Sequence, residues 1–181
     1  THYSVHTLYG RAITGAEKKK NANPELNVIV LSGDGDLLSI GGNHLLHASR
    51  RGTNIKVICV NNRIYGMTGG QASSTTPKNV RTSTTPYGNK EETINVQDIV
   101  TCYDNLFART TVYHFDHMKN IFNECLSSDK FSFINILSNC YPSYGKKAGF
   151  KNQYDMFIKF KKDYKISNKN RLEKNEIGLI T

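Results

Sequence analysis

Long apolar runs and closely spaced metal ligands are missing from this sequence. In 181 residues no apolar stretch approaches the ~20 residues that span a bilayer, and the first residues show no signal-peptide pattern. His44 and His47 stand three positions apart, without the His-Glu-x-x-His pattern of a zinc enzyme. We therefore expect no membrane segment. The length fits one domain with a proper core.

The four cysteines show neither the short spacing of a metal site nor the framework of a secreted disulfide protein. Cys59 lies in a strand-like apolar run, and Cys102 and Cys125 lie in helical patterns. We interpret these three as reduced, buried thiols and predict a cytoplasmic location. Cys140 differs, because it follows a strand-like run directly and lies in a polar turn.

Acidic residues are the minority, with 15 Asp and Glu against 24 Lys and Arg, which gives a net charge of +9. Much of the excess comes from residues 18–20 and from the segment after Gly149. In that segment Phe157, Phe160 and Tyr164 recur at helical spacing, which is typical of a buried helix stripe rather than of a stacking surface for bases. We expect no nucleic acid, and interpret the lysines as solvated faces or as a patch for an acidic partner.

The centre of the chain has the pattern of a strand, a helix and a second strand. Residues 28–31 and 55–60 are short, fully apolar runs typical of strands that are buried on both faces. Between them apolar residues recur at helical spacing until Gly52, a plausible helix stop. Such a unit usually has parallel strands, and open sheets of this kind bind ligands at the carboxyl ends of their strands.

The residues at those carboxyl ends suit a phosphate and a divalent cation. Gly33, Asp34 and Gly35 follow the first run, and Asn62 follows the second. Glycines let the backbone approach a ligand closely, and a helix start offers free N–H groups to a phosphate. Asp34 and Asn62 offer hard oxygen ligands, which Mg²⁺ prefers in combination with phosphate oxygens. An ordinary strand-to-helix turn capped by aspartate is the structural alternative.

Gly33-Asp34-Gly35 with Asn62 at 28 positions from Asp34 resembles the thiamine diphosphate motif. With residues 64–71, Ile-Tyr-Gly-Met-Thr-Gly-Gly-Gln, the chain resembles the β subunit of 2-oxoacid:ferredoxin oxidoreductases of the 2-oxoglutarate or branched-chain type. The resemblance runs from about His6 to Gly145. It also includes residues 10–12, 23–24, 74–77, 84–88 and 137–140.

The resemblance implies a thiamine diphosphate-binding α/β fold, with a mostly parallel sheet and helices on both faces. It implies oxidative decarboxylation of a 2-oxoacid with coenzyme A, and electron transfer to ferredoxin. Asp34, Asn62 and the Ile64 carbonyl would hold Mg²⁺, and Gly33, Gly35, Gly66 and Met67 would contact the diphosphate or frame its pocket. The family's activating carboxylate lies on an α subunit, so we expect no catalytic residue here and no activity without that partner.

The sequence departs from the family pattern in two respects, its cysteines and the residue at position 9. The family binds a [4Fe–4S] cluster with an N-terminal Cys-x-x-Cys segment, a further cysteine and a fourth at the position of Cys140. Only Cys140 is present, so we expect a fragment whose full-length protein would hold the cluster. The family usually has a cofactor-pocket histidine where this chain has Tyr9, which cannot act as a base near neutral pH.

The remaining segments are assigned by pattern. We predict a cofactor domain over residues 1–150 and a basic helical tail, possibly truncated, over residues 151–181. Residues 10–23, 93–107 and 116–125 are predicted to be helices, and 108–113 and 131–137 strands. The Ser/Thr-rich residues 72–88 are either a flexible surface loop or a lid that contacts a partner.

Two other functions stay open at this point. One is a non-oxidative thiamine diphosphate-dependent decarboxylase or synthase, against which the Met67 loop and Cys140 argue. The other is a basic, non-catalytic binding module, which would have no need of the Asp34 and Asn62 pair.

Overall fold

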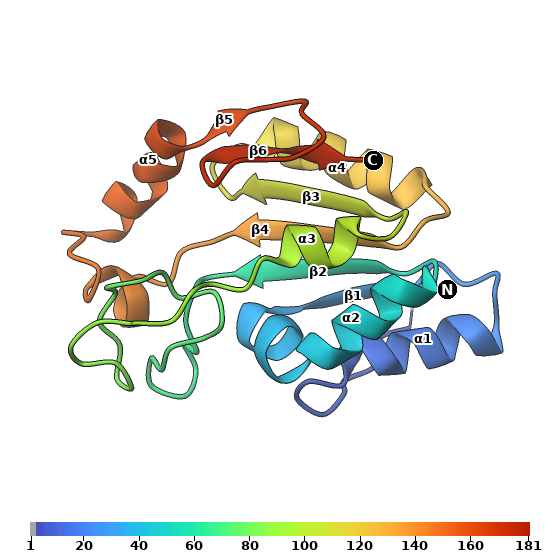
Figure 1. Cartoon of the computed structure of the whole chain (residues 1–181), viewed down its shortest axis with the longest axis horizontal. Helices are drawn as coiled ribbons and strands as arrows, with labels where there is room; N and C mark the ends of the chain where they lie inside the picture. Colours follow the sequence, from blue (N-terminus) through green and yellow to red (C-terminus); the bar gives the residue numbers. More distant parts are fainter. Residues whose placement is uncertain (1–2) are drawn as a thin grey trace.

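The computed structural model of the chain describes residues 3–181, and a six-stranded sheet forms its centre (Figure 1). The strands lie in the order β1-β2-β4-β3-β6-β5, and the first four in this order are parallel. β6 runs antiparallel to β3. The strands are β1 Ile29–Gly33, β2 Lys56–Asn61, β3 Leu106–Thr111, β4 Ser132–Leu137, β5 Lys165–Ile166 and β6 Glu176–Ile180.

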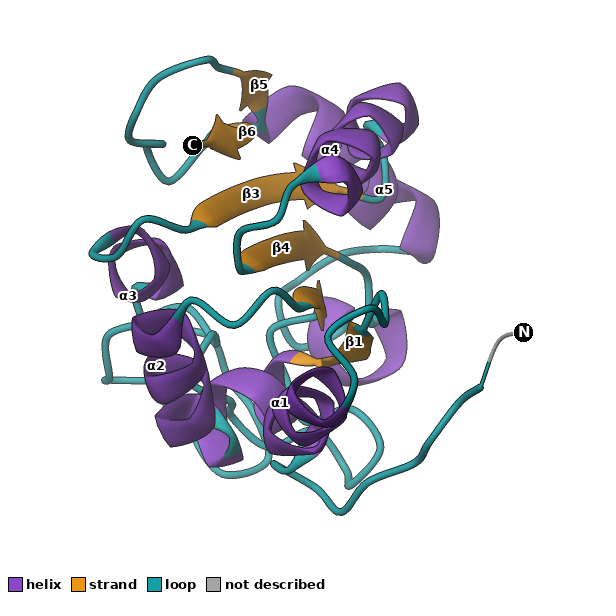
Figure 2. Cartoon of the chain, turned by 90° about the vertical axis from the view of Figure 1, so that its right-hand side faces the viewer, coloured by secondary structure: helices purple, strands orange, loops and turns teal. Residues whose placement is uncertain are grey.

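Helices cover both faces of this sheet, as predicted (Figure 2). On one side lie α1, α2 and α3, and on the other lies α4 with α5 beyond it. The helices are α1 Ala12–Ala22, α2 Gly42–Arg51, α3 Val96–Thr101, α4 Phe115–Ser127 and α5 Gln153–Asp163, with two wide π-type segments, η1 Gly35–Ile40 and η2 Tyr141–Gly145. No helix in residues 3–181 is both long and apolar enough to cross a membrane.

Alternation along the strands gives two separate apolar cores. On the α1–α3 face, Val57, Phe107 and Phe133 pack with residues of those helices. On the α4 face, Ala108 and Ile134 pack against Ile121 and other residues of α4. β4 is buried along its whole length because it lies in the middle of the sheet. These cores fix the parallel strands, and the carboxyl ends of those strands therefore meet at one edge (Figure 1).

The helix predicted over residues 93–107 is much shorter in the structure. Asn95 caps α3 by accepting a hydrogen bond from the backbone N–H of Asp98, and the helix ends at Thr101. The chain then turns, and Leu106 already belongs to β3. Cys102 follows the end of α3 and is exposed, so its assignment as a buried thiol is wrong. Cys59 and Cys125 are buried, as predicted.

The helix predicted after the glycine motif is divided at Gly41. A side chain there would stand 2.5 Å from the carbonyl oxygen of Asp36, so only glycine fits between η1 and α2. Gly41 is thus closely packed, whereas a Cβ on Gly42 would meet no atom within 4 Å. Gly52 ends α2 with a φ of 62°, which confirms the predicted stop.

Residues after position 150 are only partly helical. Within the tail predicted to be helical, only α5 forms a helix. Glu176–Ile180 forms β6 beside β3, and Leu172 and Ile180 join the core of the α1–α3 face. The division of the chain at residue 150 therefore separates two segments that share one sheet. Residues 72–88 pack as well, with Ser73, Thr75, Thr76 and Thr82 buried.

Candidate cofactor site

The candidate site lies where β1 and β2 end, beside the segment that follows β4 (Figure 1). Gly33 is the last residue of β1 and pairs with Val60 of β2. Asp34 stands between β1 and η1, and Gly35 begins η1. Because the strands are parallel and in register, the turn after Asn61 is brought beside Asp34.

Asp34 is a buried carboxylate without a basic partner. Its side chain is 1% exposed, and none of the ion pairs among the described residues includes it. Its Oδ2 accepts hydrogen bonds from the hydroxyls of Ser73 and Thr75, both at 2.6 Å. Its Oδ1 accepts from the backbone N–H of Asn62 at 3.3 Å. Burying a carboxylate is costly unless a positive charge balances it, so the surroundings of Asp34 fit a cation.

Asn62 and Ile64 form the turn that faces this carboxylate. The Asn62 Oδ1 accepts from the backbone N–H of Ile64 at 3.1 Å, which leaves one of its two lone pairs free. The Ile64 carbonyl oxygen accepts no hydrogen bond from the residues that the structure describes. A carboxylate, an amide oxygen and a free carbonyl are the hard oxygen donors that Mg²⁺ binds. The residues predicted to hold Mg²⁺ therefore suit that ion in chemistry.

A side chain has no room at Gly35 and would be tightly packed at Gly66. A Cβ on Gly35 would strike the ring of Tyr65, whose hydroxyl donates to the Gly35 carbonyl at 3.4 Å. A Cβ on Gly66 would lie 3.2 Å from the sulfur of Cys140 and 3.7 Å from the Asn62 amide nitrogen. Gly66, Asn62 and half-buried Cys140 are thus neighbours.

Met67 is the one predicted contact residue that no neighbour covers. Its side chain is fully exposed on the loop between Tyr65 and Gln71, which form an isolated β-bridge. Gly70 closes this loop by donating its N–H to the Tyr65 carbonyl at 2.9 Å. A role for Met67 in contacting a diphosphate stays a prediction.

Several residues of the site were not singled out by the sequence. Asp36 is also buried, and it accepts hydrogen bonds from the backbone N–H of Gly10 and from the Ser32 hydroxyl. Ser73 and Thr75 come from the Ser/Thr-rich loop, about 40 residues from Asp34. A polar loop that directly follows a glycine-rich turn was the only signal, and it did not say which hydroxyls reach the carboxylate.

Tyr9 occupies the position where a histidine was expected. Its ring lies 6.4 Å from that of Tyr65, measured between centroids. Burial raises the pKa of Tyr9 to about 12, with Tyr65, Asp36 and Asp34 acting in the same direction. The phenol therefore stays protonated at neutral pH, and it can donate a hydrogen bond but cannot serve as a base.

Iron binding by this chain alone finds no support in the geometry. Within residues 3–181 no group of three or more His, Cys, Asp or Glu side chains could hold a metal ion. Among these residues Cys140 therefore belongs to no such group.

The chain is similar to known proteins at the level of family and sequence. Residues 1–136 match the family described as thiamine pyrophosphate enzyme, C-terminal TPP binding domain. The chain is 40% identical over 171 residues to the 2-oxoglutarate synthase subunit KorB of Methanothermobacter marburgensis, covering 94% of this chain and 60% of that subunit. It is 41% identical over 141 residues to the 2-oxoacid:ferredoxin oxidoreductase subunit beta of Saccharolobus solfataricus, covering 77% of this chain and 46% of that one.

A solved structure is similar over almost the whole chain. It is the 2-oxoglutarate:ferredoxin oxidoreductase from Magnetococcus marinus with 2-oxoglutarate, coenzyme A and succinyl-CoA bound. The match has a TM-score of 0.85 at 28% identity and covers 98% of this chain and 64% of that one. The chain thus spans about 60% of the length of the curated relative first named above.

Proposed function

The chain belongs to the family of C-terminal thiamine pyrophosphate-binding domains, and on that premise we propose that it is part of the β subunit of a 2-oxoacid:ferredoxin oxidoreductase. Similarity to subunits of such enzymes from two archaea supports the proposal, as does the likeness to the Magnetococcus marinus enzyme. The observation that carries it is the buried carboxylate of Asp34, which has no ion pair and is hydrogen-bonded to the turn of Asn62 and Ile64, where an amide oxygen and a free carbonyl lie. The proposed reaction is oxidative decarboxylation of a 2-oxoacid with coenzyme A.

In the proposed complex Asp34, Asn62 and the Ile64 carbonyl hold Mg²⁺, and Gly33, Gly35, Gly66 and Met67 lie at the diphosphate. Bound thiamine diphosphate would supply the carbanion that makes decarboxylation possible. Ser73 and Thr75 fix the direction of the Asp34 carboxylate before the metal arrives, because their hydroxyls already bind its Oδ2. Gly35 makes room for the Tyr65 ring and begins η1 beside Asp34, where backbone N–H groups would meet the diphosphate.

Cys140 is proposed as one of four ligands of a [4Fe–4S] cluster in the full-length protein. Its support here is its position: the sulfur lies next to Gly66 and therefore close to the cofactor loop. The other three ligands would come from residues outside this chain. A cluster at that place would receive electrons from the cofactor and pass them to ferredoxin.

A partner subunit is part of this proposal, because no catalytic carboxylate is assigned in this chain. Apolar residues on the uncovered face of β1 and β2 are consistent with such a partner: Ile29 is 50% exposed, Leu31 69% and Val60 36%. Exposed apolar side chains that cluster on one sheet face are typical of an interface. We propose an α subunit as the occupant and keep the cytoplasm as the proposed location.

The test is the activity of the full-length complex with its partner subunit. Reduction of ferredoxin is followed with 2-oxoglutarate and with branched-chain 2-oxoacids, with and without coenzyme A. Turnover that depends on coenzyme A, together with iron and labile sulfide, would support the proposal. Release of CO₂ without ferredoxin reduction, from a complex free of iron, would identify a non-oxidative decarboxylase instead.

A further inference from the structure

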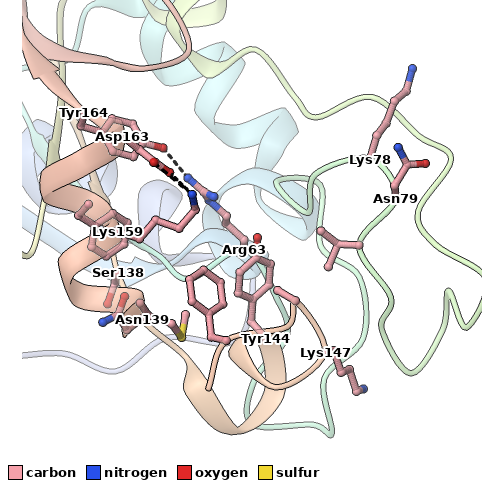
Figure 3. A pocket seen from close by; sticks show the side chains of 15 residues that line it. Arg63, Lys78, Asn79, Ser138, Asn139, Tyr144, Lys147, Lys159, Asp163 and Tyr164 are labelled. Carbon is pink, nitrogen blue, oxygen red and sulfur yellow. Dashed lines mark hydrogen bonds and ion pairs between the residues drawn. The ribbon is translucent and has the colours of Figure 1, made fainter. Parts of the chain in front are cut away.

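A second pocket lies beside the cofactor site and shares none of its predicted ligands. Its volume is about 350 Å³. It lies between the turn after β2, residues 78–80 of the Ser/Thr-rich loop, η2 and α5 (Figure 3). Its lining combines basic, amide and phenol groups with apolar side chains. The lining residues used below are Arg63, Asn139, Tyr164, Phe150, Met156 and Phe160.

Arg63 enters this pocket from an unusual backbone conformation. Its φ is 66°, a left-handed value that residues other than glycine seldom adopt. The conformation is held from both sides: the Arg63 N–H donates to the Asn61 Oδ1 at 3.1 Å, and the Thr76 hydroxyl donates to the Arg63 carbonyl at 2.6 Å. Such an outlier, held by several bonds, points to a requirement for the side chain it presents.

The guanidinium of Arg63 lacks a carboxylate partner among the described residues. Its Nη2 donates to the Tyr164 hydroxyl at 2.6 Å, and Figure 3 shows it in the middle of the lining side chains. Asp163, the acidic residue of the lining, is paired with Lys159 at 2.8 Å. Lys78 at the rim is paired with Glu92. The pocket therefore holds a positive charge that no side chain balances.

Asn139 adds a second group without a partner. Its amide oxygen is buried and makes no hydrogen bond to any described residue, although it lines the same pocket. Buried polar groups in folded proteins almost always have a partner, so an orphan of this kind points to an absent one. The two ends of an amide are similar in shape, and the side chain can therefore present either its oxygen or its NH₂ group to a ligand.

We propose that this pocket binds a small molecule through an oxyanion group, a phosphate or a carboxylate, on Arg63. A guanidinium offers two parallel N–H donors, which match the oxygens of either group. Tyr164 holds the guanidinium in place, and Asn139 supplies a further hydrogen bond. Phe150, Met156 and Phe160 give the rest of the ligand an apolar wall. This site is independent of the proposed thiamine diphosphate function.

The test is calorimetric titration of the full-length protein with its partner subunit, loaded with thiamine diphosphate and Mg²⁺. Sodium phosphate and sodium acetate are the probes, and sodium chloride at the same ionic strength is the blank. The parent protein should bind one of the two probes saturably, and the probe that binds identifies the oxyanion. Arg63→Gln should weaken this binding at least tenfold. The matched control is Arg50→Gln, which removes the same charge from the exposed surface of α2 and should change nothing.

Two further variants keep the result decisive. Asn139→Asp preserves the shape of the side chain and adds a negative charge to the pocket, so it should also abolish binding of the probe. It serves as the test if Arg63→Gln does not fold. Asp34→Asn should lose the cofactor but keep the probe, which separates this site from the proposed function. Absence of saturable binding by the parent protein, or equal binding by parent, Arg63→Gln and Asn139→Asp, would overturn the assignment.

Discussion

Asp34 and Asp36 stand two residues apart in one glycine motif, and their hydrogen-bond donors come from different parts of the chain. Both carboxylates are buried. Asp36 ties distant backbone together, because it accepts from the N–H of Gly10 at the start of α1 and from Ser32 in β1. Asp34 receives two loop hydroxyls and the N–H of Asn62, all neutral donors. The Asp36 carboxylate therefore joins the segment before α1 to β1, whereas the Asp34 carboxylate lies among the loops of the candidate metal site.

The difference has a physical consequence for stability. A buried carboxylate without a cation is costly, and a site prepared for a metal holds that cost until the metal binds. Asp36 lies in the same motif, but its hydrogen bonds join the segment before α1 to β1, and we assign it no metal. Variants at the two positions should thus move stability and cofactor affinity in different directions.

The largest effect is expected from Asp34→Asn. Loss of the one charged metal ligand should weaken binding of thiamine diphosphate with Mg²⁺ by more than about a hundredfold. Residues that only hydrogen-bond to a metal ligand usually have a smaller effect. Without cofactor, this variant should melt at the same temperature as the parent or higher, because a buried charge is removed. Calorimetric titration and thermal melting measure the two. Wild-type cofactor affinity in Asp34→Asn would show that Asp34 does not hold the metal.

Cys140→Ser should abolish the proposed cluster, because a protonated hydroxyl is a poor iron ligand. Iron content and visible absorbance of the full-length complex are the measurements. Cys59→Ser is the matched control: Cys59 is fully buried in β2, so this variant should lose stability and keep its iron. Full iron occupancy in Cys140→Ser, or loss of iron in a well-folded Cys59→Ser, would reverse the roles of the two thiols.

Asp36→Ala should lower the free energy of unfolding by about 1–3 kcal/mol, because the Gly10 N–H and the Ser32 hydroxyl lose their acceptor. Denaturant unfolding of the cofactor-free chain measures the change. Once folded, the variant should bind the cofactor far better than Asp34→Asn does. Equal loss of cofactor in the two variants at full stability would remove the distinction between the aspartates.

Ser73→Ala should act on cofactor affinity without replacing a metal ligand. Removing one of the two hydroxyls on the Asp34 Oδ2 should weaken binding about 10- to 100-fold. Thr82→Val is a suitable control, since Thr82 is also buried in this loop but bonds only to Thr84 and Thr85. If Ser73→Ala bound the cofactor as tightly as Thr82→Val, the hydroxyls would have no positioning role.

The smallest expected effect is the pH dependence of stability, which arises from two histidines and not from the aspartates. Burial lowers the pKa values of His114 and His117, which lie near the carboxyl end of β3. Their unfolded forms bind protons more readily, so the free energy of unfolding should be constant above about pH 6.5 and fall as the pH drops below it. Denaturant unfolding between about pH 5.5 and 8, a range around the histidine pKa, should give the same slope in parent and Asp34→Asn. A slope of opposite sign would contradict the buried-histidine explanation.

The strands and the position of the site could be predicted because their signals are local. The buried strands read as continuous apolar runs, and Gly33–Gly35 and Asn62 follow two of them directly. The end of α3 could not be read, because the apolar residues of β3 continue the helical spacing across the turn at Cys102. The exposed position of Cys102 follows from that turn.

Contacts over long sequence distances explain the other omissions. Nothing near Asp34 in the sequence indicates that Ser73 and Thr75 bind it, since both hydroxyls come from a loop beyond the next strand. The Arg63 pocket needs α5 and Tyr164, which directly follows α5 and lies 101 positions from Arg63. Spacing identifies a turn that can bind a ligand, whereas folding decides which distant side chains complete it.

Binding of Mn²⁺, a paramagnetic substitute for Mg²⁺, tests the central assignment most directly. The full-length complex is titrated with Mn²⁺ in the presence and absence of thiamine diphosphate, and bound metal is followed by electron paramagnetic resonance. The parent and Asp36→Ala should each bind one ion tightly only with the cofactor, with coupling to its phosphorus nuclei, whereas Asp34→Asn should bind none. Tight, phosphorus-coupled Mn²⁺ in Asp34→Asn would contradict the assignment of Asp34 as the charged metal ligand.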